Sequence, residues 1–135
     1  MTPDEIAKLT RFLRAKFELP TISVRKRPQR KGMAEVFIGD EQVGLIEKDE
    51  EDGELSYSFS MDIENPPKEF VKITPLLQAT FDLANISVRV MPRKKDSAEV
   101  YIGDEFIGLI YRDEEDGVAS CNFTMSILDF DLDAE

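Results

Sequence analysis

Two stretches of the sequence are nearly identical, and they decide the fold. Residues 34–41 read AEVFIGDE, and residues 98–105 read AEVYIGDE. The second stretch lies 64 residues (98 − 34) after the first, and the alignment continues on both sides without a gap. Self-similarity at a fixed period indicates a duplicated structural unit. We therefore predict two tandem modules, residues 1–65 and 66–135, with Asn65-Pro66-Pro67 at the joint because prolines end the preceding strand.

Each module is expected to begin with an amphipathic helix. Thr2-Pro3-Asp4-Glu5 has the form of a capping box with proline in the first helical turn. Apolar residues then recur at helical spacing as far as about Glu18. The second helix is expected to begin near Pro67. Pro75 should kink or split it, because proline lacks the N–H that the interior of a helix requires.

Four short strands are expected to follow the helix in each module. Gly39-Asp40 predicts a two-residue hairpin turn, and Gly53 predicts a second, longer turn. The closing strands at 55–63 and 119–127 alternate apolar with polar residues, which indicates a sheet with one face buried under the helix. The fold class is therefore α+β, with one N-terminal helix on a four-stranded antiparallel meander (α-β-β-β-β) in each copy. Because modules of this size are marginally stable alone, the copies are expected to pack as a covalent pseudo-dimer.

The composition limits the classes of function. The 135 residues include 17 Lys and Arg and 28 Asp and Glu, which gives a formal net charge of −11. This charge opposes nonspecific binding to nucleic acid and to anionic membranes. The N-terminus has no basic and apolar leader, and no apolar run approaches the roughly 18 residues of a membrane span. We expect a cytoplasmic protein without a membrane segment.

The sequence lacks the residue types that most often carry catalysis. It contains no histidine, which is the commonest general base and the commonest transition-metal ligand. The single cysteine, Cys121, excludes an internal disulfide. It occupies a core-facing position of its predicted strand and has no histidine to activate it as a nucleophile. We therefore expect no enzymatic activity, no catalytic residues and no cofactor.

The central hairpin of each copy places apolar side chains on the face opposite the helix, which is expected to be exposed to solvent. A two-residue turn sets Phe37 opposite Gln42, and the equivalent turn sets Tyr101 opposite Phe106. Three interpretations stay open: scattered surface residues, packing between the two copies, which we favour, and an interaction site for another protein. Strict alternation adds one isoleucine in each copy to this face. The interaction candidates are Phe37, Tyr101, Phe106 and Ile110, and Ile46 is the first-copy equivalent of Ile110.

Two glycines interrupt the same hairpins. Gly44 and Gly108 lie in the third strand of each copy, and strict alternation puts them on the same face as the apolar residues above. A glycine within a strand marks a bulge or a close approach by another backbone. We expect one of these features at both positions.

Each copy carries a basic cluster between its first and second strands. A meander puts its first and third connections at the same end of the sheet, so each basic cluster should lie near the acidic turn of its own copy. The simplest interpretation is that the basic and acidic side chains compensate each other's charge on a solvent-exposed rim. The alternative is a phosphate or nucleic-acid site formed by loops 25–31 and 89–95. The net charge and the lack of interleaved aromatic residues make nucleic acid an unfavoured partner. The basic candidates are Arg25, Lys26, Arg27, Arg30, Lys31, Arg89, Arg93, Lys94 and Lys95.

An acidic turn precedes the last strand of each copy. Its spacing does not fit the calcium loop of an EF-hand, because Lys48 and Phe59 would stand where the first and last ligands are required. The turn is therefore interpreted as a solvated hairpin loop, with weak binding of a divalent cation as the alternative. The candidates for that alternative are Asp49, Glu51, Asp52, Asp113, Glu115 and Asp116.

The hairpin at 100–108 (VYIGDEFIG) and the turn at 112–117 (RDEEDG) carry a resemblance to a known family, and 36–44 and 49–53 echo it. They resemble a small family of alphaproteobacterial proteins of unknown function, whose members are about one module long. The resemblance implies a shared fold and no particular activity. If single-module relatives associate in pairs, the duplication in this chain makes that pair intramolecular.

Taken together, these features favour a non-enzymatic adaptor or regulatory module that binds an unknown protein or associates with itself. The outer aromatic patch and the missing catalytic residue types motivate this hypothesis. Nucleic-acid or phosphate binding through the basic loops is the first alternative, and weak divalent-cation binding at the acidic turns is the second.

Overall fold

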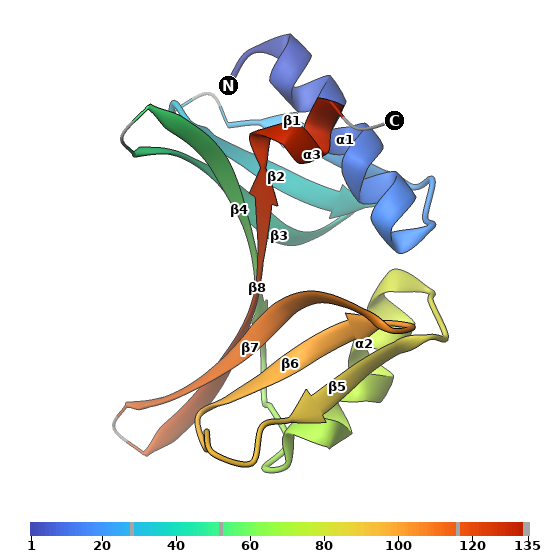
Figure 1. Cartoon of the computed structure of the whole chain (residues 1–135), viewed down its shortest axis with the longest axis vertical. Helices are drawn as coiled ribbons and strands as arrows, with labels where there is room; N and C mark the ends of the chain where they lie inside the picture. The colour runs from blue at the N-terminus through green and yellow to red at the C-terminus, as the bar shows by residue number, and fades with distance from the viewer. Residues whose placement is uncertain (28, 52, 116, 134–135) are drawn as a thin grey trace. The chain divides into compact units, whose positions relative to one another are not determined.

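The structure, a computed structural model, describes residues 1–27, 29–51, 53–115 and 117–133 (Figure 1). Both copies have the predicted order of a helical segment followed by a four-stranded antiparallel meander. The first copy contains α1 (Pro3–Phe17), β1 (Ile22–Lys26), β2 (Met33–Ile38), β3 (Glu41–Glu51) and β4 (Glu54–Ile63). The second copy contains η1 (Phe70–Ile73), α2 (Thr74–Phe81), β5 (Ile86–Val90), β6 (Ser97–Ile102), β7 (Glu105–Glu115), β8 (Val118–Leu128) and the short helix α3 (Asp129–Asp133).

The chain folds into two compact units whose limits differ from those of the repeats. Unit 1 comprises Met1–Ser60 and Ser126–Glu135, and unit 2 comprises Met61–Met125. Unit 1 therefore contains α1, β1, β2, β3, most of β4, and α3. Unit 2 contains η1, α2, β5, β6, β7 and most of β8. The last residues of each closing strand thus belong to the unit that the other copy forms.

Helix α1 begins at the predicted capping box. The side chain of Thr2 accepts a hydrogen bond from the backbone N–H of Glu5 at 3.1 Å, and the Glu5 carboxylate accepts one from the N–H of Thr2 at 2.9 Å. These two bonds satisfy donors that a helix N-terminus otherwise leaves without partners. In unit 1 the helix lies against β1 and α3 (Figure 1). Its buried residues are Leu9, Leu13 and Phe17.

The second helical segment is split, as Pro75 predicted. A 3₁₀ turn, η1, ends at Ile73, and α2 begins at Thr74 with the proline in its first turn. A proline is tolerated there because the first N–H groups of a helix have no intrahelical partner. Four apolar residues of the split segment are buried, namely Phe70, Ile73, Leu77 and Phe81, whereas Val71 and Leu76 are exposed. No helix in the described ranges is long and apolar enough to cross a bilayer.

The closing strands supply the centre of each core. Phe59 in β4 and Phe123 in β8 are fully buried, which confirms the predicted alternation. Tyr57 and its second-copy counterpart Cys121 are 2% exposed. One face of each meander is therefore a continuous apolar surface, and the polar partners in the strands lie on the other face.

A β-bulge corrects one prediction about the hairpin faces. Phe37 pairs with Gln42 as expected, but Val36 pairs with Gly44, which leaves Val43 as an extra residue in β3. An extra residue reverses the alternation of all side chains beyond it. Ile46 consequently pairs with buried neighbours and is itself fully buried.

The second copy repeats this bulge. Tyr101 pairs with Phe106 as predicted, and the register shifts between Val100 and Tyr101. Ile110 pairs with Ala98 and Phe123 and is fully buried. The assignment of Ile46 and Ile110 to the outer face was therefore wrong, because strict alternation does not count the bulged residue.

Gly44 and Gly108 lie at a bulge and a close approach, as the sequence predicted, but the prediction that they lie on the outer face was wrong. They pair with the buried residues Val36 and Val100, and a Cβ atom would point toward the core. A Cβ atom on Gly44 would lie 2.5 Å from the carbonyl oxygen of Ser60 and 2.7 Å from a ring carbon of Phe59. A Cβ atom on Gly108 would lie equally close to the carbonyl of Thr124 and 2.9 Å from the ring of Phe123. The bulged strand passes so close to the closing strand that a side chain has no room.

The substitution Gly44→Ala tests this packing. We expect it to lower the free energy of unfolding by about 1–3 kcal/mol, because the methyl group meets backbone and a core ring that are both fixed. Gln42→Ala, at an exposed position of the same strand, is the control and should change stability by less than about 0.5 kcal/mol. Urea unfolding followed by circular dichroism measures both, and equal stability of the two variants would contradict the close approach.

Candidate functional site

Unit 1 contains a pocket of about 480 Å³ beside the N-terminus of α1. Half of the ten lining residues are basic, and four of these five lie at the end of β1 or in the connection between β1 and β2. Lys48 of β3 and the first residues of the chain complete the walls. The lining residues are Met1, Thr2, Pro3, Glu5, Lys26, Arg27, Arg30, Lys31, Gly32 and Lys48.

Backbone hydrogen bonds hold the basic connection against β3. The N–H of Arg30 donates to the carbonyl of Arg27 at 3.2 Å, and the N–H of Met33 donates to the carbonyl of Arg30 at 3.4 Å. Gly32 has a φ of +80°, which glycine adopts without strain. Its carbonyl accepts a 2.7 Å hydrogen bond from the N–H of Lys48. The connection therefore approaches the side of the pocket that Lys48 forms.

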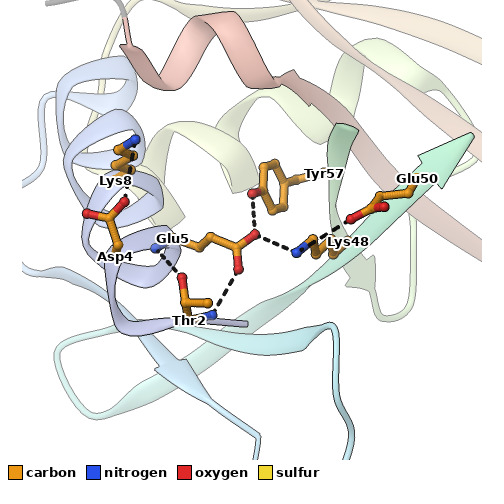
Figure 2. Close-up of polar contacts among 7 residues, drawn as sticks. All are labelled: Thr2, Asp4, Glu5, Lys8, Lys48, Glu50 and Tyr57. Carbon is orange, nitrogen blue, oxygen red and sulfur yellow. Dashed lines mark hydrogen bonds and ion pairs between the residues drawn. The ribbon is translucent and has the colours of Figure 1, made fainter. Parts of the chain in front are cut away.

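The carboxylate of Glu5 joins α1 to the sheet at the base of this pocket. Figure 2 shows it pointing from the first turn of α1 toward Tyr57 and Lys48. The hydroxyl of Tyr57 donates to Oε2 of Glu5 at 2.6 Å, and Nζ of Lys48 lies 2.9 Å from the same oxygen. The other carboxylate oxygen accepts from the N–H of Thr2. Both oxygens are thus engaged, and the Glu5 side chain is only 15% exposed.

These contacts fix the charge states of the cluster. Burial raises the pKa of Glu5, but the hydrogen bonds from Tyr57, the Thr2 backbone and Lys48 outweigh it and lower the pKa to about 2. The hydrogen bond to Glu5 raises the pKa of Lys48. Burial, followed by the bond to Glu5, raises the pKa of Tyr57. At neutral pH the pair is therefore Glu5⁻ and Lys48⁺, with a neutral tyrosine.

The residues that line the pocket have a positive net side-chain charge. Five lysines and arginines and one glutamate line it, so the charge of the lining is 5 − 1 = +4. Glu5 and Lys48 neutralise each other. Within the described residues, no ion pair joins the other four cations to an acid of the neighbouring acidic turn. The predicted compensation between the basic loop and the acidic turn is therefore not seen there, and a locally positive site exists in a chain of net charge −11.

The second copy does not form the equivalent of the Glu5 cluster, because the corresponding residues are replaced or make other contacts. Glu69 corresponds to Glu5 after the 64-residue shift, and it lies 3.7 Å from Lys72 on its own segment. About two thirds of the Glu69 side chain is exposed. Cys121 stands in the place of Tyr57 and is a buried free thiol, as predicted. The second copy therefore has no hydroxyl at this position to hold the carboxylate.

Arg112, the counterpart of Lys48, is also engaged in another way. Its guanidinium donates to the carbonyl oxygens of Lys68, at 2.5 Å, and Pro67. The same group lies 4.8 Å from the centre of the Phe70 ring. In unit 2 this cation thus anchors the segment that leads into η1. The first copy and the second copy share a fold, but the equivalent positions carry different interactions.

The structure gathers some of the predicted basic residues and separates others. Lys26, Arg27, Arg30 and Lys31 line the pocket, as a shared site requires. Arg25 instead lies in β1 with its guanidinium 3.9 Å from the centre of the Phe37 ring. Arg89 stacks in the same way on Tyr101, at 3.8 Å, while the three exposed residues Arg93, Lys94 and Lys95 follow β5 in the next connection.

The acidic turns are built mostly from strand residues. Asp49 and Glu51 belong to β3, and Asp113 and Glu115 belong to β7. The other two candidates, Asp52 and Asp116, lie outside the described residues. Among the described residues, no three or more acidic or cysteine side chains lie together in a way that could hold a metal ion. In the described ranges, the turns therefore form no metal centre.

The outer aromatic patch is smaller than predicted. Ile110 is buried, and arginines cover the rings of Phe37 and Tyr101. Phe106 packs edge-on against Tyr101, with 5.8 Å between the ring centres, and is 50% exposed. What remains of the patch in unit 2 is the pair Tyr101 and Phe106, with Arg89 on one side.

Sequence reasoning missed the cluster of Glu5, Lys48 and Tyr57. The cluster had a readable signal, because a buried tyrosine needs a hydrogen-bond partner and Tyr57 occupies a core-facing position. Glu5 was assigned to the capping box only, and one of its two oxygens does serve that box. The partner of the second oxygen depends on how α1 packs on the sheet, which local patterns do not specify.

Both halves of the chain match the same known family. A family model described as protein of unknown function (DUF3126) matches the chain twice, over residues 5–66 and 69–131. The chain belongs to this family. The two matches confirm the tandem duplication and the resemblance to a family without an assigned function. Comparisons of this DUF3126 protein with curated proteins and with solved structures gave no match.

The depressed pKa of Glu5 predicts how stability depends on pH. The value is about 2 in the folded protein against 4.5 for the unperturbed group, so the stabilisation is complete above pH 4.5 and disappears as the pH falls toward 2. We expect Glu5→Gln to remove about 2 kcal/mol of this pH-dependent stability. Urea unfolding between pH 2 and neutral pH, at constant ionic strength, measures the difference between variant and parent.

The matched control is Glu69→Gln, the same change at the equivalent position of the second copy. Glu69 is mostly exposed and pairs with Lys72 on the surface, so its substitution should leave the pH dependence unchanged. Identical profiles for the two variants would contradict the assigned role of Glu5.

Proposed function

We propose that this DUF3126 protein is a non-enzymatic binding module whose first copy binds a phosphate-bearing anion in the pocket beside α1. The observation that carries the proposal is the group of four cations that line a 480 Å³ space, namely Lys26 at the end of β1 and Arg27, Arg30 and Lys31 in the connection that follows. The acid that shares the pocket, Glu5, is neutralised by Lys48. A net charge of +4 in a chain of net charge −11 is the arrangement that an anionic ligand requires.

The types of cation in the pocket favour phosphate. Arg27 and Arg30 carry planar guanidinium groups, whose paired N–H donors match the oxygens of a phosphate group. Lys26 and Lys31 add mobile point charges that adapt to the remaining oxygens. The backbone hydrogen bonds that hold the connection to β3 reduce the ordering that binding must impose.

The charge states in the pocket support a binding role rather than catalysis. A general acid or base works best when its pKa lies near the working pH, and the pKa of Glu5 is about 2. Lys48 has a raised pKa, so its amine is held as the ammonium ion and is not a nucleophile. The sequence also contains no histidine. These residues position and neutralise charge, and they do not move protons at neutral pH.

Two other functions fit the structure less well. Nucleic acid would meet a protein of net charge −11, and no aromatic residue lines the pocket to stack on a base. A protein-interaction role through the outer patch remains a second proposal, supported by the half-exposed ring of Phe106. The burial of Ile110 and the arginines over Phe37 and Tyr101 leave that surface small.

The two copies provide a matched test of the anion site. Arg30→Glu with Lys31→Glu reverses two charges of the pocket, and Lys94→Glu with Lys95→Glu makes the same change 64 residues later. Inorganic phosphate should raise the thermal unfolding temperature of the parent and of the second variant, because a ligand of the folded state stabilises it. It should not raise that of the first variant. Scanning calorimetry at constant ionic strength measures this, and an equal response of both variants would contradict the proposal.

A further inference from the structure

The pocket is larger than a single phosphate group needs. Its volume is about 480 Å³. The pocket is open to solvent, so this volume gives room for a ligand with more than one phosphate group and sets no upper limit on the size of the ligand.

The charge of the pocket also exceeds that of one phosphate. After the mutual neutralisation of Glu5 and Lys48, the four cations of the connection leave a charge of +4. A phosphate monoester carries about −1.5 to −2 at neutral pH. One such group would therefore compensate about half of the pocket, and two adjacent groups would compensate nearly all of it.

The four cations fall into two equivalent pairs. Lys26 and Arg27 precede the turn of the connection, and Arg30 and Lys31 follow it. Each pair contains one arginine, which can donate to two oxygens of one phosphate, and one lysine. Two pairs of this kind suit a ligand that presents two phosphate groups side by side.

The second copy carries a different set of cations. Val90 and Met91 stand where the first copy has Lys26 and Arg27. Arg93, Lys94 and Lys95 stand at the positions of Gln29, Arg30 and Lys31, so the cations follow the turn and none precedes it. The turn itself is kept, since the N–H of Lys94 donates to the carbonyl of Met91 at 3.1 Å. The first copy is therefore distinguished by the cation pair that precedes a turn present in both copies.

From the volume, the charge and this pairing, we infer that the ligand of the first-copy pocket is a diphosphate, with each phosphate held by one arginine–lysine pair. The inference rests on the proposed function and makes its ligand more specific. The diphosphate could be free or part of a nucleotide. The pocket lining contains no aromatic ring, so the recognised part is the diphosphate itself and a base adds no affinity.

Isothermal titration calorimetry on the full chain, at constant ionic strength and neutral pH, tests the inference. The four probes are inorganic diphosphate, inorganic phosphate, ADP and AMP. We expect diphosphate to bind at least about tenfold more tightly than phosphate, as two charge-assisted contacts replace one. ADP should bind no more tightly than inorganic diphosphate, and AMP should behave like inorganic phosphate.

A double substitution to the residues of the second copy isolates the first cation pair. Lys26→Val with Arg27→Met should reduce the affinity for diphosphate to that for phosphate, because it removes one of the two phosphate positions. The backbone accepts valine and methionine at these positions in the second copy. Arg30→Gln tests the other pair with a smaller change, and Lys94→Gln with Lys95→Gln is the control that should leave all affinities unchanged.

The outcomes separate this inference from the proposed function. Equal affinities of the parent for phosphate and diphosphate would overturn the inference and leave the anion site standing. Binding of ADP far tighter than that of diphosphate would also overturn it, since the base would then be recognised. No heat of binding with any of the four probes would overturn the proposed function as well.

Discussion

The contacts of the Glu5 carboxylate join α1 to the sheet in unit 1, and the charge of the neighbouring pocket depends on them. One carboxylate oxygen caps α1, and the other is held by the hydroxyl of Tyr57 and the ammonium group of Lys48. A helix end, the closing strand and the third strand therefore meet at one charged group with little exposure to solvent. Because Glu5 and Lys48 neutralise each other, the cations of the adjacent connection face the pocket without an opposing charge from its lining. The second copy, with Cys121 in place of Tyr57, shows how the same fold persists without this cluster.

Much of the fold was predictable because it follows from local rules. The capping box, the effect of Pro75 and the period-two burial around Phe59 and Phe123 all depend on residues close together in the chain. The faces of the central hairpin were not fully predictable. The sequence around Gly44 did indicate a bulge or a close approach. Only the observed strand register shows that Val43 is the extra residue, and that the side chain of Ile46 therefore points into the core.

The site was predictable only in part, because it combines segments that are distant in the sequence. The basic run from Lys26 to Lys31 was visible as a cluster of charge. Whether these residues line a pocket depends on the packing of α1 and on the hydrogen bond between Gly32 and Lys48, which lie 16 residues apart in the sequence. Arg25 belongs to the same run and yet stacks on Phe37 of the neighbouring strand. Strand geometry, rather than charge density, decides which cations of the run reach the pocket.

If the two copies share one fold and only the first has an anion site, an amide NMR titration of the intact chain with inorganic diphosphate will distinguish them, because each copy gives its own signals. We expect the largest shifts at Arg27, Gly32 and Lys48, and little movement at their counterparts Met91 and Arg112. Shifts of similar size in both copies, or the largest shifts at Phe106, would contradict this expectation.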